Sequence, residues 1–175
     1  MRFKSLYLLG FSLLLCACAP NTDINKEVPE NPADFNLRTN QTTYLAEPDT
    51  GFSYSFSLTA ELENTTGETL YLDLCYPDDT YPIYGVTLAD EESGESAWNP
   101  AWGCVGHSES IALEPGETRT DTYQLTGPTS SKDGQPLGEM EGLFRLFYRT
   151  LACADSDVCE ASGITSNAFR IELAE

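Results

Sequence analysis

The sequence predicts an all-β protein with a single folded domain. Apolar and polar residues alternate without a break over residues 52–62, which is the period of a strand with one buried face. Turn residues separate about eight such stretches at intervals of roughly ten residues, and almost no stretch shows helical apolar spacing. These features predict an antiparallel β-sandwich of Greek-key type, with a small β-barrel as the alternative.

The expected strands follow one another with turn chemistry between them. The motif Asn64-Thr65-Thr66-Gly67 separates two alternating stretches and predicts a hairpin or a pair of neighbouring strands. Glu114-Pro115-Gly116-Glu117 fits a type II turn, because Pro fixes φ at the second position and Gly accepts a positive φ at the third. The expected strands cover residues 42–45, 52–62, 70–75, 84–88, 111–113, 118–125, 143–151 and 164–173.

The charge of the chain is strongly negative. Its 175 residues include 28 acidic and 9 basic residues, which give a net charge of -19 and an isoelectric point near 4.1. Nucleic-acid binding is excluded as a function, because it needs clustered Lys and Arg to neutralise phosphates. Hydrophobic residues make up 41% of the chain, too many for a disordered acidic tail.

The first seventeen residues predict an export signal. Arg2 and Lys4 are followed by an apolar stretch over residues 6–15. This stretch has about half of the ~20 residues that a membrane-spanning helix needs, and it has the charge order of a secretory leader. We therefore expect residues 1–17 to be a signal peptide.

The end of this leader resembles the lipobox of bacterial lipoproteins. In Leu15-Cys16-Ala17-Cys18, a small residue precedes Cys18, whereas Leu15 would directly precede the cut at Cys16. The resemblance implies that Cys18 carries the diacylglycerol and the further acyl chain, such as palmitate, that anchor the protein to membrane lipid. Residues 18–39 are rich in Pro, Asn and acidic residues and are expected to be a flexible linker before a domain over residues 40–175.

The resemblance to a lipobox implies that the domain lies outside the cytoplasm, in the cell envelope. Asp after the lipidated Cys would resemble an inner-membrane retention signal, and Ala19 stands there instead. This favours the outer membrane if the host has two membranes. Loss of residues 1–17 removes Arg2 and Lys4 but no acidic residue, so the mature chain would carry a net charge of -21.

Four cysteines remain after the leader. An even number in an exported chain predicts disulfides, and four cysteines allow three pairings. The spacing favours Cys153 with Cys159 and Cys75 with Cys104. A metal site is a weaker interpretation, because the chain has no C-x-x-C pair.

No constellation of catalytic residues stands out, and no cofactor is expected. The single histidine, His107, has no nucleophile motif near it, and acidic pairs arise from the acidic composition alone. The one metal candidate is a weak calcium site at Asp155 and Asp157, since hard oxygen ligands alternate there between two cysteines. We therefore expect the protein not to be an enzyme.

Aromatic residues gather in the middle of the chain. Tyr and Trp on loops make large, rigid contacts, which makes Tyr81, Trp98 and Trp102 candidates for binding a protein or glycan partner. The alternative is that Trp98 fills the core while the tyrosines cover a long crossover.

The order of the motifs is itself informative. It runs through Glu63-Asn64-Thr65-Thr66-Gly67, Trp98 after an acidic turn, Leu113-Glu114-Pro115-Gly116-Glu117, Gly142-Leu143-Phe144-Arg145-Leu146 and Ser166-Asn167-Ala168-Phe169-Arg170-Ile171. It resembles small immunoglobulin-like domains of bacterial lipoproteins and is similar in layout to intracellular proteinase inhibitor-like (BsuPI-type) domains. The resemblance implies an immunoglobulin-like β-sandwich. The expected function is therefore a membrane-anchored, non-enzymatic binding or structural module, and the alternative is an extracytoplasmic protease inhibitor with an extended loop such as residues 130–137.

Overall fold

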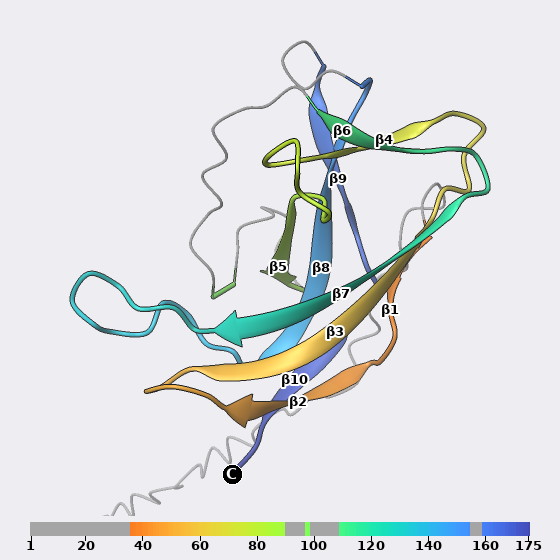
Figure 1. The fold of residues 1–175 in the computed structure, drawn as a ribbon. Coiled ribbons are helices and arrows are strands. Elements are labelled where there is room, and N and C mark those ends of the chain that lie inside the picture. Colours follow the sequence, from red (N-terminus) through yellow and green to blue (C-terminus); the bar gives the residue numbers. More distant parts are fainter. Residues whose placement is uncertain (1–35, 90–96, 99–108, 155–158) are drawn as a thin grey trace, which may run out of the picture.

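The protein is all-β in the computed structural model, which describes residues 36–89, 97–98, 109–154 and 159–175. No helix occurs among these residues, and ten strands form one curled, mixed sheet with the shape of a half-barrel (Figure 1). The strands are β1 (Asn36–Thr39), β2 (Thr43–Pro48), β3 (Tyr54–Glu63), β4 (Leu70–Asp73), β5 (Tyr84–Leu88), β6 (Ser110–Leu113), β7 (Thr118–Gly127), β8 (Gly142–Leu151), β9 (Ala161–Thr165) and β10 (Phe169–Leu173). The prediction of an all-β fold is confirmed.

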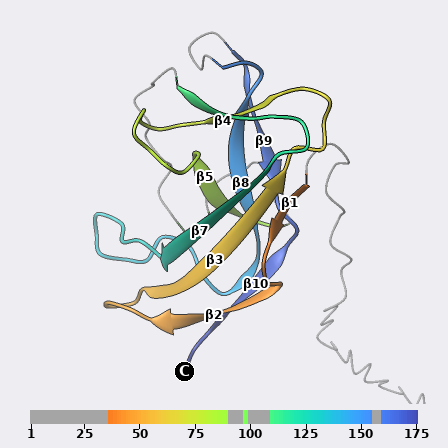
Figure 2. The ribbon, with the colours of Figure 1, turned by 45° about the vertical axis from the view of Figure 1, so that its right-hand side comes forward.

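Two long strands organise the sheet. β3 pairs with β7 along its whole length on one edge, and with β1 and β2 on the other. β8 pairs with β9 and β10 on one edge and with β4 and β5 on the other, and β4 continues to β6. The β3–β7 pair lies in front of β8 in both ribbon views (Figures 1 and 2).

The prediction of a purely antiparallel sandwich is wrong in one respect. β2 pairs antiparallel with β3 and parallel with β10, so it belongs to both sides and joins them into one sheet. Residues 43–46 of β2 pair along most of β10, and Glu47 and Pro48 pair with the start of β3. The described strands therefore form a curled sheet in place of two separate sheets.

The core lies on the concave side of this sheet. The expected alternation over residues 52–62 is confirmed within β3, where Phe56, Leu58 and Leu62 are buried. Phe52, which shares that sequence pattern, precedes the strand and is 36% exposed. Other large buried side chains come from β1, β4, β8 and β10 and include Leu37, Leu72, Leu146, Phe144, Phe169 and Ile171.

The largest differences from the expected strands are one additional strand and one divided strand. β1 begins at Asn36, so the residues that pair with β3 start inside the predicted linker 18–39. The expected strand 164–173 is divided into β9 and β10 by the buried Ser166 and by Asn167. The Ser166 hydroxyl accepts a hydrogen bond from the Leu146 backbone N–H at 3.0 Å, and Asn167 Oδ1 accepts one from the Thr39 N–H at 2.9 Å.

Asn64 explains the predicted turn between β3 and β4. Its side chain is fully buried and donates to the backbone oxygens of Glu68 and Leu113, both at 2.8 Å. Its Oδ1 accepts hydrogen bonds from the backbone and the hydroxyl of Thr66. A buried amide is stable only when it is hydrogen-bonded, and here these bonds connect the β3–β4 turn to β6.

Candidate functional site

The segment between β4 and β5 carries the predicted partner-binding residue Tyr81. We call residues 76–83 the aromatic loop, because the side chains of Tyr76 and Tyr81 are 50% and 45% exposed. Large aromatic side chains are enriched where proteins contact partners. The aromatic loop is therefore the candidate partner-binding surface among the described residues.

Backbone hydrogen bonds hold both ends of the aromatic loop. Asp79 donates its N–H to the Tyr76 oxygen at 3.0 Å, and its carboxylate accepts the Tyr76 N–H at 2.9 Å. At the other end, the Ile83 N–H donates to the Asp73 oxygen at 2.8 Å, and the Ile83 oxygen accepts the Arg149 N–H at 3.0 Å. Backbone hydrogen bonds of Ile83 thus attach the loop to both β4 and β8.

A buried polar network supports the loop from below. Arg119 on β7 donates to both carboxylate oxygens of Asp121, at 2.7 and 2.6 Å, and also to the backbone oxygen of Thr80 in the loop. Tyr148 on β8 donates to Asp121 Oδ2 at 3.1 Å, and Tyr123 on β7 donates to Tyr148 at 2.7 Å. The Asp121 carboxylate on β7 thus connects to β8 through Tyr148, and Arg119 connects the same carboxylate to the loop.

The rings of this network extend to the surface. Tyr123 lies with its ring centroid 4.1 Å from that of Tyr84 and 5.2 Å from that of Tyr81. Tyr81 therefore packs in a tilted arrangement against a buried tyrosine, while nearly half of its surface is exposed. Rings at these separations attract one another beyond simple area burial.

The electrostatics of the network favour neutral tyrosines beside a charged pair. Burial raises the pKa of Tyr123 and of Tyr148 far above the usual range for tyrosine, and the charge of Asp121 adds to both shifts. Burial by itself would lower the pKa of Arg119, but the hydrogen bonds and charge of Asp121 outweigh it and raise that pKa. Both hydroxyls thus remain hydrogen-bond donors at physiological pH, which is a structural role.

A second ion pair, in which only the carboxylate is buried, lies next to the loop. The Arg149 Nε is 3.0 Å from Oδ2 of Asp73, whose side chain is only 4% exposed. Burial raises the pKa of Asp73, although the charge of Arg149 opposes that shift. Asp73 thus holds the loop through its backbone oxygen and β8 through its carboxylate.

Two hollows flank these elements. The smaller, of about 260 Å³, lies under the aromatic loop and is lined by Cys75, Asp78, Asp79, Thr80, Tyr81, Pro82, Ile83 and Tyr84. The larger, of about 810 Å³, is an open groove between the β3–β4 turn and the β8–β9 hairpin, with Glu68, Glu160 and several Thr and Ser residues around it. The smaller hollow adds two carboxylates to the exposed ring of Tyr81.

Trp98 does not belong to this surface. It is 2% exposed, and its ring packs edge-on against Phe144 at a centroid distance of 4.8 Å. The alternative prediction, in which Trp98 fills the core, is the one that the structure supports. Trp102, the third candidate, lies outside the described residues.

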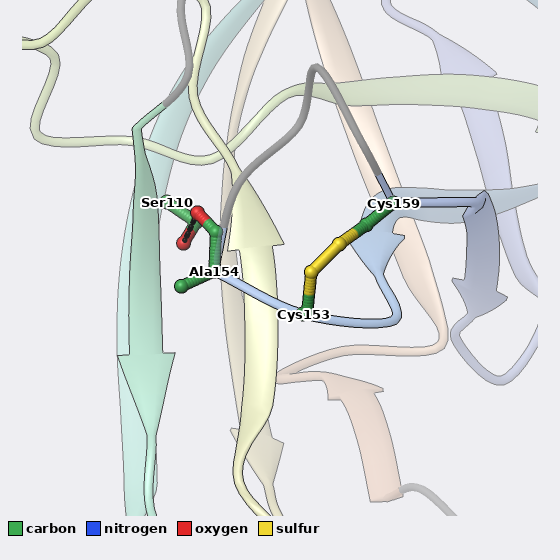
Figure 3. Close-up of a disulfide and its surroundings, with 4 residues drawn as sticks. All are labelled: Ser110, Cys153, Ala154 and Cys159. Carbon is green, nitrogen blue, oxygen red and sulfur yellow. Dashed lines mark hydrogen bonds between the residues drawn. A yellow bond between two sulfur atoms is a disulfide. The ribbon is translucent and has the colours of Figure 1, made fainter.

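The disulfide prediction for Cys153 and Cys159 is confirmed (Figure 3). Beside it, the Ser110 hydroxyl donates to the backbone oxygen of Ala154 at 2.9 Å, which attaches β6 to the start of this loop. Cys75 is buried and disulfide-bonded, and Cys104, its expected partner, lies outside the described residues.

The remaining predicted sites fall mostly outside the described residues. These are the lipidated Cys18 and the weak calcium candidates Asp155 and Asp157. Within the described ranges, no group of three or more His, Cys, Asp or Glu residues could hold a metal ion. The same ranges hold no helix that is long and apolar enough to cross a membrane.

The loop suggested for protease inhibition has a closed shape. Ser131 donates its N–H to the Gln135 oxygen at 2.7 Å, and Gly134 donates to the Ser131 oxygen at 3.0 Å. Ser130 and Pro136 form a β-bridge below this turn. Residues 130–137 therefore form a short hairpin that projects beyond β7 (Figure 1), and not an extended segment.

Sequence reasoning missed the network beneath the loop. Asp121 shares the buried face of β7 with Tyr123 and Leu125, and Arg119 precedes it on the same face. A charged residue at a core-facing strand position, with an opposite charge two residues away, is a signal that could have indicated the ion pair. The partners from β8 and the aromatic loop are distant in sequence, so no local pattern indicates them.

The comparisons with known proteins give no family. No family model and no curated protein matches the chain. Several solved structures of a β-glucosidase from Listeria innocua are similar, among them complexes with gluconolactone and with glucose, at 15% and 18% sequence identity. Each has a TM-score of 0.28, and the match covers 78% of this chain but only 16% of the β-glucosidase.

Proposed function

We propose that this protein is a lipid-anchored protein of the bacterial cell envelope whose β-domain is a non-enzymatic binding module. The lipobox-like residues before Cys18 support the anchor. The disulfide between Cys153 and Cys159 supports an oxidising, extracytoplasmic compartment. The same proposal includes the immunoglobulin-like classification of the domain, which the strand order in the sequence suggested.

The observation that carries the binding role is the presentation of Tyr81. Tyr81 is 45% exposed, yet its loop is fixed by the Arg119 hydrogen bond to Thr80 and by backbone bonds to Asp73 and Arg149. A contact residue held in place before binding loses little conformational freedom when the partner arrives. An exposed aromatic ring on an anchored loop is therefore suited to contact a protein or glycan.

Photo-cross-linking in the native envelope tests the surface. A photoreactive amino acid at position 81 of the full chain should give a discrete adduct with a protein or glycan partner. The same substitution at Leu45, which is 56% exposed on β2, is the control and should give none. Equal adducts from both positions, or none from position 81, would contradict the proposed surface.

Fractionation tests the anchor independently. The full chain should sediment with membranes, whereas Cys18→Ser should appear in the soluble fraction, because two or more acyl chains are needed for stable anchoring. Cys16→Ser is the matched control and should remain with the membranes. Membrane association of Cys18→Ser would contradict the lipid anchor and leave the binding surface unaffected.

A further inference from the structure

The second edge of β7 has no described strand beside it. β7 pairs with β3 in an unbroken register from Tyr54–Gly127 to Glu63–Thr118, and it pairs with no other described strand. A ten-residue strand with one open edge presents a row of backbone N–H and C=O groups to any further strand. This edge is the longest such row in the described part of the chain.

The hydrogen bonds around β3 show which groups point outward from β7. The Asn64 N–H donates to the Glu117 oxygen, so the odd-numbered residues of β7 bond to β3. The backbone of Thr59 agrees with this pattern, because its N–H and its oxygen both bond to Asn40, on the edge of β3 away from β7. Thr122, which lies opposite Thr59, therefore has no backbone bond to it. The outward-pointing backbone groups therefore belong to Thr118, Thr120, Thr122, Gln124 and Thr126. No hydrogen bond among the described residues uses them.

The side chains of these same residues are exposed and uncharged. They alternate with the buried residues of β7, so they line the convex face of the strand beside its open edge. In a chain with a net charge of -19, a run of four threonines and one glutamine without a single carboxylate is a local exception. The edge also lacks the Lys, Pro or bulge by which many natural edge strands prevent edge-to-edge pairing, and the charges of β7, on Arg119 and Asp121, lie on its buried face.

We propose that this edge is a homodimer interface, on which β7 of a second copy pairs antiparallel about a two-fold axis at Thr122. A surface that binds a basic partner usually presents acidic side chains, and the outward residues of β7 include none. The same uncharged residues on a second copy can approach this edge without local charge repulsion. The axis at Thr122 places Thr118 opposite Thr126 and Thr120 opposite Gln124. Every outward backbone group then has a partner, and Thr–Thr pairs across strands are favourable.

Charge variants on neighbouring strands test the interface. Thr122→Lys places two lysines against each other on the axis, and it should weaken dimerisation of the full chain in detergent at least about tenfold. Ser57→Lys is the control, because it adds the same charge to the same exposed face of the sheet. Ser57 lies on β3, two residues from Thr59, which is the residue opposite Thr122, and it is away from the open edge. This variant should leave dimerisation unchanged in sedimentation equilibrium, and far-UV circular dichroism should show both variants folded.

Salt and amide exchange provide two further measurements. The dimer of this acidic chain should strengthen when salt is raised roughly tenfold, because screening reduces the repulsion between copies. At high protein concentration the amides of Thr120, Thr122 and Gln124 should become protected from hydrogen exchange, whereas that of Tyr123 should be protected at every concentration. Thr122→Pro, which removes an outward N–H and no bond to β3, should abolish this change.

A chain that stays monomeric at all concentrations, or an equal effect of Thr122→Lys and Ser57→Lys, would overturn the interface. Neither result bears on the aromatic loop, because Tyr81 lies on the concave side of β7 above Tyr123. Tyr81→Ala should accordingly leave the dimerisation constant unchanged.

Discussion

Tyr123 on β7 donates a hydrogen bond of 2.7 Å to Tyr148 on β8, although the described parts of these strands share no backbone pairing. This bond spans the concave side of the half-barrel. Tyr148 in turn donates its own hydroxyl hydrogen to Asp121 on β7. Two strands on opposite sides of the sheet are thus joined through side chains alone. The aromatic loop rests on this connection through the rings of Tyr81 and Tyr84.

Asp121→Asn should destabilise the fold by about 2–3 kcal/mol, because it removes the charged acceptor of Arg119 and Tyr148 while both remain largely buried. Urea unfolding of the variant and the wild type measures the difference. Glu61→Gln is the matched control, since the Arg38–Glu61 pair is exposed and should contribute less than about 1 kcal/mol. Equal losses in the two variants would contradict a supporting role for the network.

Asp73→Asn should change the pH dependence of stability. Burial raises the pKa of Asp73 in the folded state above the ordinary value of 3.8, so ionising it costs folding free energy. The contribution of the protonated carboxyl to the free energy of unfolding is fully present at pH values below the pKa in the unfolded chain. It is lost as the pH rises through the pKa in the folded state. The isosteric neutral variant should therefore be at least as stable as the wild type at pH ~7, and the difference should vanish below pH ~3.5.

Urea unfolding across this pH range measures the effect of Asp73→Asn. The comparison uses the difference between variant and wild type, so the other carboxylates of the chain cancel. A variant that is less stable than the wild type at neutral pH, and equal to it in acid, would show that the Arg149 ion pair outweighs the burial of Asp73.

Gly127→Ala should destabilise the core around Trp98. A Cβ at position 127 would lie 1.9 Å from Cδ1 of Trp98, so the indole must move, at a cost of about 1–3 kcal/mol. In a Trp102→Phe background, the emission of Trp98 should shift to longer wavelength. Gly85→Ala is the control, because no atom lies within 4 Å of the added Cβ there. An unshifted emission maximum in Gly127→Ala would contradict this packing.

Removing the Cys153–Cys159 disulfide should cost about 2 kcal/mol, as expected for a cross-link that closes a short loop in the unfolded chain. The double variant Cys153→Ala/Cys159→Ala isolates this effect in urea unfolding. Ser110→Ala, which loses only the hydrogen bond to Ala154, should cost less. Wild-type stability in the double variant would show that the loop entropy does not contribute.

The strands could be predicted where one face is buried. β3, β7 and β8 were found from their alternation because a half-buried strand must repeat with a period of two. The division between β9 and β10 escaped prediction, because it depends on the hydrogen bonds of Ser166 and Asn167 to distant strands. β1 escaped because it has only four residues, one of them the apolar Leu37.

The candidate surface was predicted only in part. Tyr81 was identified from residue type and position, and it is exposed as the binding interpretation requires. Trp98 has the same residue-type signal but lies in the core, against Phe144. Residue type indicates what a side chain is able to contact, whereas burial depends on which strands come together.

The sequence by itself determined the all-β class, the turns at residues 64–67 and 114–117, the acidic composition and the pairing of Cys153 with Cys159, because these depend on local periodicity, composition and short loops. Only the tertiary structure decided that β2 joins the two sides, that Asp121 links β7 to β8, and that the open edge of β7 is uncharged. These features depend on contacts between residues far apart in the chain. Their partners are selected by the packing of whole strands, which no local pattern encodes.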